Sequence, residues 1–467
     1  MLNFIKQNWR WCLGLTICAA LLRLYFILKL SNIQGDSLVY GEIAKGLVTQ
    51  HMYGVEHANG WAPTLIRLPG YPLFLAFTFL LFGVDHYIGA MLFQLVFDVL
   101  TCFLVADIAR RIFSERAARI ALLISALCPF LMSYVAAPLT ESIEIFFTAA
   151  AFDAVLLALD SRLLRWWAAA GAAIAGAILL LPDGGILLGC IGLPVLALMW
   201  RESNRRRELF LGILLLGAVS LSPLAPWAIR NYRVFHVFQP LVRPEAIDPN
   251  ETIAYGYGHW LNTWVFDYTN TLDLGFPVPG EPIRFEDVPD RAFTSPDQRE
   301  IVRELFRQYN QVNDFSAEAD REFEAMARAN IRRHPLRHYI VLPFMRTLDM
   351  WFRPRTEMLP LDAHFWRFRA DPHDSSWSIA LGVLNLLYVA AAIAGAWMLR
   401  RRWFLIALLL TYPVLRTLFL AATNAFEDRY TMECFPAIFV LAAGWLAHLQ
   451  TQRSIAHPVP ERTKARA

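Results

Sequence analysis

Long apolar stretches separated by short polar connections run along most of this chain. Each main stretch is close to or above about 18 residues, enough for a helix to cross the hydrocarbon core of a bilayer. We predict spanning helices at residues 10–30, 87–108, 120–137, 142–160, 166–182, 185–200, 209–228, 378–399, 403–422 and 431–449. The pattern therefore indicates an all-α polytopic membrane protein with about 10–11 spans: ten from the segments above, and an eleventh if one ambiguous segment also crosses.

Two further apolar segments fit a spanning helix less well. The segment 71–84 is short for a crossing, and we expect it to lie at the membrane interface. The segment 338–352 contains Arg346 and Asp349, and a crossing here would move the basic loop 400–402 to the outer side. We therefore favour an interfacial or re-entrant helix at 338–352, with a crossing as the alternative.

The basic connections predict how the helices are oriented. Lysine and arginine gather in the loops 109–119, 161–165, 201–208 and 400–402, which we place on the cytoplasmic side. The other side then carries 31–86, 138–141, 182–184, 229–377 and 423–430. Four parts follow: an N-terminal transmembrane module 1–228 with the first outer loop 31–86, a periplasmic or extracellular insert 229–377, C-terminal transmembrane helices 378–450 and a basic cytoplasmic tail 451–467.

The outer insert carries the signals of a small helical unit. Ser295 can cap a helix that has Pro296 at its first position, and apolar residues then recur at helical spacing. A second helix is predicted to begin near Ser316. We expect a small, mostly helical insert and not a large independent domain.

The composition agrees with a membrane protein. Of the 467 residues, 56% are hydrophobic and 18% are charged, whereas about a quarter of a soluble protein is charged. The first apolar segment lacks a small-residue cleavage site, so we expect it to be retained as a helix. The six cysteines lie in or beside apolar runs without zinc or disulfide spacing, and we expect free thiols. We expect no nucleic-acid partner.

Acidic and arginine residues gather on the predicted outer side. The candidates are Asp36, Glu42, Arg67, Glu141, Asp183, Arg230, Arg233, Arg353, Arg355 and Arg429. Each has a purely structural alternative: arginines at helix ends can snorkel, Asp36 can cap a helix, and Glu141 can favour a helix dipole. The histidines at 51, 57, 364 and 373 lack helical metal-ligand spacing.

The combination is more informative than any single residue. Arginines can bind the phosphate of a lipid headgroup, and a carboxylate at the same depth can remove a proton from an attacking hydroxyl. When a sugar leaves a lipid phosphate, arginine stabilises the charge that develops there, so no general acid is needed. These groups suffice for inverting transfer of a glycosyl group.

The segment after the first helix favours Asp36 over Glu42 as the reactive carboxylate. Asp36 lies where the helix leaves the bilayer. In the following amphipathic stretch, Val39, Ile43 and Leu47 form an apolar stripe, which we interpret as a lipid-facing surface. Glu42 then belongs to the solvated face and is a weak candidate.

Several motifs together resemble a known enzyme class. They are "GDSLVYGEIAKGL", "RLPGYPLFLAFTFLLFG", "PLTES", "PWAIRNYRVF", "WFRPRTE" and "RYTMECFPAIFVLAAG". In this order the chain resembles the integral-membrane GT-C glycosyltransferases that use polyprenyl-phosphate sugars, in the branch of the protein O-mannosyltransferases and aminoarabinose transferases. Two positions differ from that pattern: Ser37 follows Asp36 in place of Glu, and Leu181 stands where related sequences have Arg.

The resemblance implies roles for individual residues. Asp36 would be the catalytic base, and Glu141 a second catalytic residue that positions substrate. The donor phosphate would be bound by Arg67, Arg230 and Arg429. Beyond the resemblance, we also expect Arg355 to bind the phosphate and Tyr40, Tyr71 and Asp183 to position substrate. The fold would be a GT-C bundle with interfacial helices in the first outer loop.

We therefore predict an inverting glycosyltransferase of the cytoplasmic membrane with its active site on the outer face. It would move a mannose-like hexose or an aminopentose from a polyprenyl-phosphate donor to a hydroxyl of a protein, lipid A or another glycan. No cofactor is predicted, although carboxylates could hold a loosely bound divalent cation. The alternatives are a transporter or flippase of lipid-linked sugars, for which Asp98, Asp153 and Arg416 inside the helices matter most, and an inactive binding protein of the same fold.

Overall fold

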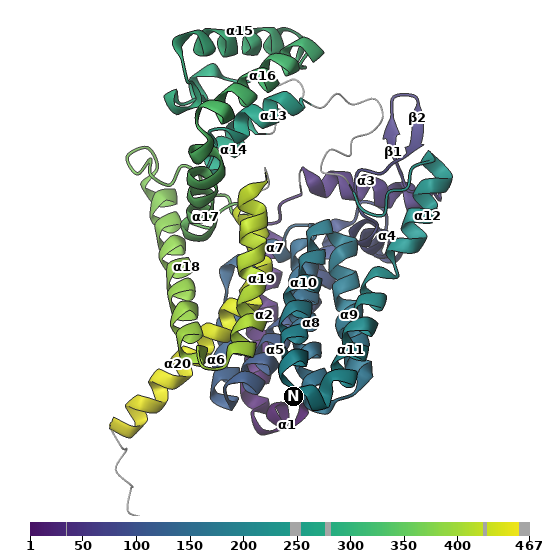
Figure 1. The fold of residues 1–467 in the computed structure, drawn as a ribbon, viewed down its shortest axis with the longest axis vertical. Coiled ribbons are helices and arrows are strands. Elements are labelled where there is room, and N and C mark those ends of the chain that lie inside the picture. Colours follow the sequence, from purple (N-terminus) through teal and green to yellow (C-terminus); the bar gives the residue numbers. More distant parts are fainter. Residues whose placement is uncertain (34, 243–253, 276–281, 424–426, 457–467) are drawn as a thin grey trace, which may run out of the picture.

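The computed structural model describes residues 1–33, 35–242, 254–275, 282–423 and 427–456. Most of these residues form a bundle of long helices, and a smaller helical unit lies beyond one end of it (Figure 1). The distal part of the predicted basic tail, residues 457–467, and residues 424–426 of the predicted outer loop lie outside the described residues.

The described part of the chain has eight helical segments long and apolar enough to cross a membrane. They are α2 (Trp9–Lys29), α5 (Tyr87–Ile112), α8 (Glu141–Ser161), α10 (Ile186–Arg201) with the turn Pro182–Gly185, α11 (Arg206–Leu221) continued by α12 (Leu224–Phe235), α18 (Pro372–Leu399), α19 (Trp403–Ala422), and α20 (Phe435–Ala456) with the turn Asp428–Cys434. A short α1 (Leu2–Gln7) precedes α2. The prediction of a polytopic helical membrane protein is confirmed.

The two other predicted spans are broken or short. α6 (Glu115–Ala126) and α7 (Pro129–Val135) meet at an angle of 52°, so they make a ninth span only if the bent pair crosses as one. Pro129 stands at the first position of α7, where a proline suits the start of a new helix. α9 (Leu164–Leu180) is apolar but has 17 residues. All ten predicted stretches therefore correspond to apolar helices, but not all to single straight spans.

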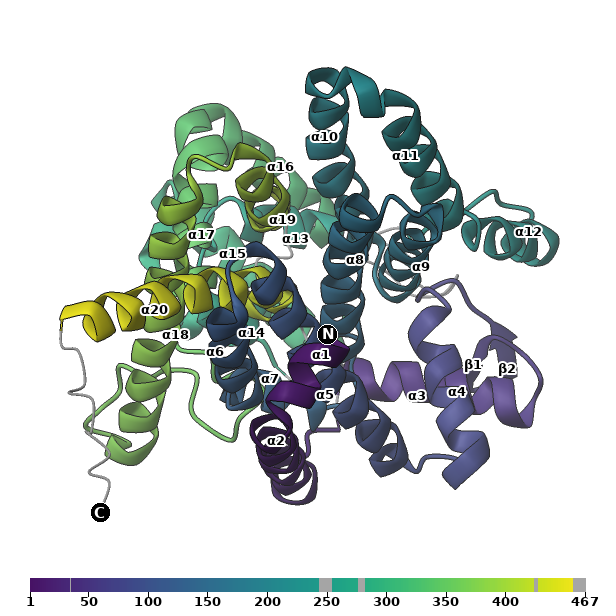
Figure 2. The same cartoon turned by 90° about the horizontal axis from the view of Figure 1, so that it is seen from below.

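The centre of the bundle is close-packed and contains α5, α8 and α20 (Figure 2). α18 approaches α20 so closely that a Cβ on Gly395 would come within 2.0 Å of the carbonyl oxygen of Leu441. Only glycine allows this approach. The six cysteines, all within the described residues, are free thiols as predicted.

The predicted first outer loop folds into two helices and a hairpin. α3 (Asp36–Thr49) is followed by antiparallel strands β1 (Gly54–His57) and β2 (Gly60–Pro63), and then by α4 (Gly70–Phe82). The interpretation of a lipid-facing stripe on α3 is wrong: Ile43 is fully buried, and Val39 and Leu47 pack with it against Val55 and Trp227. The stripe is covered by the hairpin and by α12 because these elements fold back onto α3.

The insert is helical, as predicted. It contains α13 (Tyr255–Asn262), α14 (Tyr268–Leu274), α15 (Pro296–Val312) and α16 (Ala317–Arg333), with short 3-10 turns at Phe285–Asp287 and Asp290–Ala292. The Ser295 hydroxyl accepts a hydrogen bond from the backbone N–H of Gln298, and Ser316 caps α16 in the same way. Aromatic rings of α13, α15 and α16 form its core.

The ambiguous segment forms a π-helical turn at Arg337–Val341 followed by α17 (Leu342–Phe352). Tyr339, Ile340 and Phe344 are exposed, whereas Arg346 is buried and donates hydrogen bonds to the carbonyl oxygens of Asn262 and Val265. Arg346 therefore fastens α17 to the insert. Whether this helix is interfacial or re-entrant stays a prediction, as do the domain boundaries.

Candidate active site

The carboxylate of Asp36 lies between two arginines that are far apart in the sequence. Its Oδ1 accepts a hydrogen bond from Nη2 of Arg67 at 2.7 Å, and its Oδ2 accepts one from Nη2 of Arg429 at 3.3 Å. Asp36 is the first residue of α3 and follows Gly35, which occupies the N-cap position, and the hydrogen bonds of its carboxylate to described residues come from the two arginines. The alternative of a helix cap is therefore wrong, and both carboxylate oxygens face guanidinium groups.

Arg67 is held by the first outer loop. It lies between β2 and α4, where its carbonyl oxygen accepts a hydrogen bond from the Tyr53 hydroxyl at 2.9 Å. Its guanidinium lies 5.5 Å from the centre of the Tyr40 ring, a cation–π distance. Tyr40 packs edge-on against Tyr71, whose hydroxyl donates to Gln94 at 2.6 Å. The two predicted substrate-positioning tyrosines are buried and form the aromatic wall behind Arg67.

Arg429 is surrounded by carboxylates. It belongs to the turn before α20, and its Nε lies 2.9 Å from Glu427 and 4.0 Å from Glu141. With Asp36 these make three carboxylates around one guanidinium. If all are ionised, the cluster of Asp36, Glu141, Glu427, Arg67 and Arg429 carries one negative charge. Glu141, predicted as the second catalytic residue, therefore reaches Asp36 through Arg429.

The electrostatics of the cluster keep Asp36 ionised. Burial raises the pKa of Asp36, but Arg429 and Arg67 outweigh burial and hold this pKa below its ordinary value. For Glu427 burial prevails over the attraction of Arg429, and its pKa is raised. The carboxylate best placed as a charged acceptor of protons in this cluster is thus Asp36.

Two predicted phosphate ligands lie outside this cluster. Arg230 donates to the carbonyl oxygens of Tyr53 at 2.7 Å and Thr64 at 2.9 Å, and so ties the β1–β2 hairpin to α12. Arg355 is 2% exposed and donates to the Asp428 carbonyl oxygen at 2.9 Å and to Oγ1 of Thr431 at 2.6 Å. Both guanidinium groups are occupied by protein groups that shape the site.

Asp183 belongs to a second, deeper network around Arg416. The fully buried Arg416 guanidinium lies 3.1 Å from Asp183, 3.3 Å from Glu144 and 3.2 Å from Glu433. Its Nε donates to the carbonyl oxygen of Tyr430 at 2.6 Å, one residue after Arg429. This network joins α8, α10, α19 and the turn before α20. Asp183 thus supports the site indirectly, through its ion pair with Arg416, which in turn holds the turn that carries Arg429.

Sequence reasoning missed several of these acids. Glu427 stands in the same short loop as Arg429, whose positive charge drew attention first, and Glu144 and Glu433 look like isolated charges within apolar runs. A signal was available for Glu144, because it lies three positions after Glu141 and therefore near the same helix face. Of the other charges inside helices, Asp98 pairs with the buried Arg23, and Asp153 lies 3.5 Å from Arg111.

A further pair of carboxyl groups, the partly buried Glu357 and the buried Asp428, lies next to the cluster, in the chain or through Arg355. Glu357 accepts a hydrogen bond from the Tyr134 hydroxyl at 2.8 Å. Burial, followed by repulsion from Asp428, raises the pKa of Glu357 to about 8. The carboxylate oxygens of the buried Asp428 find no hydrogen-bond partner among the described residues.

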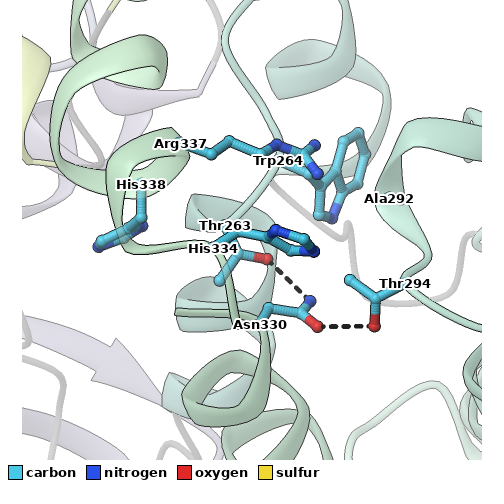
Figure 3. A pocket seen from close by; sticks show the side chains of 8 residues that line it. All are labelled: Thr263, Trp264, Ala292, Thr294, Asn330, His334, Arg337 and His338. Atoms are coloured by element: carbon cyan, nitrogen blue, oxygen red, sulfur yellow. Dashed lines mark hydrogen bonds between the residues drawn. The ribbon is translucent and has the colours of Figure 1, made fainter. Parts of the chain in front are cut away.

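Figure 3 shows an enclosed polar pocket elsewhere, within the insert. Asn330 there donates to Thr263 at 3.2 Å and is hydrogen-bonded to Thr294 at 3.1 Å. The cavity of about 10 Å³ has room for about one water molecule. It is a packing detail and not a substrate site. Within the described ranges, no group of three or more His, Cys, Asp or Glu side chains is placed to hold a metal ion, and the expectation about cofactors stays a prediction.

A sequence model of the family described as dolichyl-phosphate-mannose-protein mannosyltransferase matches residues 63–227, a range that includes Arg67, Glu141 and Asp183. No curated protein matches the chain significantly. The resemblance to GT-C glycosyltransferases that the motifs indicate is confirmed.

Solved structures of an archaeal membrane enzyme show the same fold. The archaeal oligosaccharyltransferase AglB from Archaeoglobus fulgidus, in complex with an inhibitory peptide and a dolichol-phosphate, aligns with a TM-score of 0.51 and 16% identity over 97% of this chain and 52% of that chain. The oligosaccharyltransferase of the same organism tethered to an acceptor peptide aligns with a TM-score of 0.52 and 16% identity, over 97% of this chain and 51% of that chain. ArnT from Cupriavidus metallidurans in the apo state aligns with a TM-score of 0.40 and 16% identity, over 97% of this chain and 79% of that chain. The chain spans about half the length of the archaeal enzyme.

Proposed function

We propose that this protein is an inverting glycosyltransferase that transfers a sugar from a polyprenyl-phosphate donor to an acceptor hydroxyl. The observation that carries this proposal is the position of the Asp36 carboxylate between Arg67 and Arg429, at 2.7 Å and 3.3 Å. A charged base beside two cations is what a reaction needs when a hydroxyl is deprotonated and a phosphate leaves.

The reaction breaks one bond to carbon and forms another. The acceptor oxygen attacks the anomeric carbon, and its proton passes to a carboxylate oxygen of Asp36. The bond from the anomeric carbon to the phosphate oxygen breaks, and the lipid phosphate departs with the bonding electrons. Arg67 and Arg429 stabilise the charge that develops on this phosphate, so the leaving group needs no proton. Attack opposite the leaving group inverts the anomeric carbon.

Asp36 and the donor phosphate must share the same guanidinium groups. In the structure both oxygens of Asp36 are engaged by arginine. A phosphate that takes one of these N–H donors frees a carboxylate oxygen for the acceptor hydroxyl. Donor binding and activation of the base are then coupled, because the same arginines serve both.

The membrane setting supports a lipid-linked donor at the outer face of the cytoplasmic membrane. α3, which begins with Asp36, lies at the end of the bundle that carries the insert (Figure 1), and Asp36 contacts Arg429 there. The archaeal enzyme of the same fold was solved with a dolichol-phosphate and with an acceptor peptide. The acceptor here would be a hydroxyl of a protein, of lipid A or of another glycan. No resident cofactor is part of the proposal, and a loosely bound divalent cation is compatible with it.

A transporter is less well supported than an enzyme. A transport path needs polar groups that face a cavity inside the bundle. Asp98 and Arg416 are buried and paired with charges of the protein itself. These charges hold helices together.

The direct test is the variant Asp36→Asn, with transfer measured in membranes from a radiolabelled polyprenyl-phosphate sugar. We expect a fall of about 10²–10⁴-fold in rate, the usual contribution of a general base. Glu42→Gln is the matched control: Glu42 lies on the same helix and accepts a hydrogen bond from the Glu56 N–H, which glutamine can preserve. A wild-type rate for Asp36→Asn would exclude Asp36 as the base.

A further inference from the structure

A cavity of about 460 Å³ lies where the insert meets α17, apart from the Asp36 cluster. Its walls come from α14, the 3-10 turns at 285–287 and 290–292, α17 and the loop after α17. Sites for small molecules typically have about 300–1,000 Å³. We call this cavity the insert pocket, and the reaction described above makes no use of it.

The insert pocket has more carboxylates than guanidinium groups. Five carboxylates and three arginines line it. Arg291 is paired with Asp267 at 2.6 Å, and Arg353 donates to the carbonyl oxygen of Ala363 at 2.8 Å. The side chains of Glu286, Asp287 and Arg367 form no ion pair or hydrogen bond with another described residue. Two carboxylates and one guanidinium are therefore open to a ligand, and the excess of carboxylates over arginines in the lining disfavours an anionic ligand.

Aromatic rings form the other part of the wall. Trp366 is 56% exposed, although it lies beside His364 with ring centres 5.3 Å apart. Behind the lining, Tyr268 contacts both Arg353, at 4.5 Å from its ring centre, and Asp349, which accepts a hydrogen bond from the Tyr268 N–H at 2.9 Å. An exposed indole next to free carboxylates suits a ring with one apolar face and hydroxyls at its edge.

Bonded contacts connect the insert pocket to the Asp36 cluster. Arg353 lines the pocket, and two residues later Arg355 donates to the carbonyl oxygen of Asp428. Asp428 directly precedes Arg429, which contacts Asp36. A ligand held in the pocket therefore lies against the segment that supports the reactive carboxylate.

We propose that the insert pocket binds a saccharide without negative charge, which stacks on Trp366 and donates hydroxyl hydrogen bonds to Glu286 and Asp287. This saccharide is the acceptor, or the part of the acceptor next to the reacting hydroxyl. The role as acceptor rests on the proposed function, whereas binding to the pocket does not.

The test measures binding by isothermal titration to the full chain in lipid nanodiscs. Three probes differ in charge: the trimer of glucosamine, its fully N-acetylated form and the trimer of galacturonic acid. We expect the first two to bind and the anionic trimer to bind at least tenfold more weakly. Trp366→Ala should weaken binding of the neutral trimer at least tenfold, and the matched control Phe368→Ala should not, because Phe368 is exposed but does not line the pocket.

A double variant, Glu286→Gln with Asp287→Asn, should reduce the discrimination against the anionic trimer. The proposal is overturned if no trimer binds, if the anionic trimer binds as well as the others, or if the two aromatic variants behave alike. These outcomes are independent of the donor reaction. An inactive Asp36→Asn protein should still bind the neutral trimer, so failure of the pocket and failure of the proposed reaction are distinguishable.

Discussion

The guanidinium of Arg355 donates a hydrogen bond of 2.9 Å to the backbone carbonyl of Asp428, the residue directly before Arg429. A second bond, of 2.6 Å, reaches Oγ1 of Thr431 on the other side of Arg429. Arg355 thus fixes the backbone on both sides of the arginine that contacts Asp36. We infer that Arg355 positions Arg429, whereas its contact with the donor phosphate stays a prediction.

Arg355→Lys should lower the transfer rate about tenfold, because lysine cannot reproduce the forked set of hydrogen bonds. If Arg429 moves away from Asp36, the carboxylate loses a cation and its pKa rises, so the acid limb of the rate profile moves to higher pH. The measurement is transfer as a function of pH. Arg369→Lys, an exposed arginine in the same loop, is the control and should leave the profile unchanged.

The pH dependence of the wild-type protein should reflect the lowered pKa of Asp36. A base must be ionised to act, so its contribution is lost only as the pH falls through this pKa, below the ordinary range of aspartate. Arg67→Gln removes a neighbouring cation and should raise the pKa, shifting the loss of activity upward. An unchanged acid limb in Arg67→Gln would contradict the assignment of Asp36 as the titrating base.

Arg67 and Arg230 should fail in different ways. Arg67→Gln should lower transfer by about 10²-fold, the typical effect of removing one donor to a developing charge. Arg230→Gln should lower stability by about 1–3 kcal/mol, because the hairpin loses two hydrogen bonds from a charged donor to the carbonyl oxygens of Tyr53 and Thr64. Donor titrations and thermal unfolding in detergent separate the two. If the affinity for the donor falls equally in both variants, Arg230 also binds the donor phosphate, as the sequence predicts.

The Arg416 network should be sensitive to charge balance. Arg416→Met leaves Glu144, Asp183 and Glu433 buried without their cation, which should destabilise the protein by about 3–5 kcal/mol. Adding Glu144→Gln should recover part of this loss. Asp183→Asn alone should lower the unfolding temperature without raising the KM for the donor. A KM effect with unchanged stability would instead support the predicted contact of Asp183 with substrate.

Hydrophobic patterning located all ten apolar stretches because lipid demands long apolar helices whatever their partners. The hairpin at residues 54–63 was missed, although Asn59-Gly60 at its turn is a strong hairpin signal. The stripe at Ile43 was misread, since a half-buried helix shows the same period whether it faces lipid or protein. Amphipathicity alone cannot tell these environments apart.

The candidate site was predictable only in part. Asp36, Arg67 and Arg429 stand beside apolar segments, where their charge draws attention in the sequence. The bonds of Arg230 and Arg355 are made to backbone carbonyls of distant segments, which no residue pattern reveals. The partners of Arg416 come from three other places in the chain, and only folding brings them together.

The contact of Asp36 with Arg429 joins positions 393 residues apart. During synthesis Asp36 and Arg67 leave the ribosome long before the segment that carries Arg429. At that stage the nascent chain contains Asp36 and Arg67 but not Arg429, and most of its helices are still to be inserted. Arg429 is added with the turn before α20, so under the proposed function the site becomes complete at a late stage of membrane insertion. A chain that ends before that turn has Asp36 and Arg67 without Arg429, so under the proposed function it would lack the complete site.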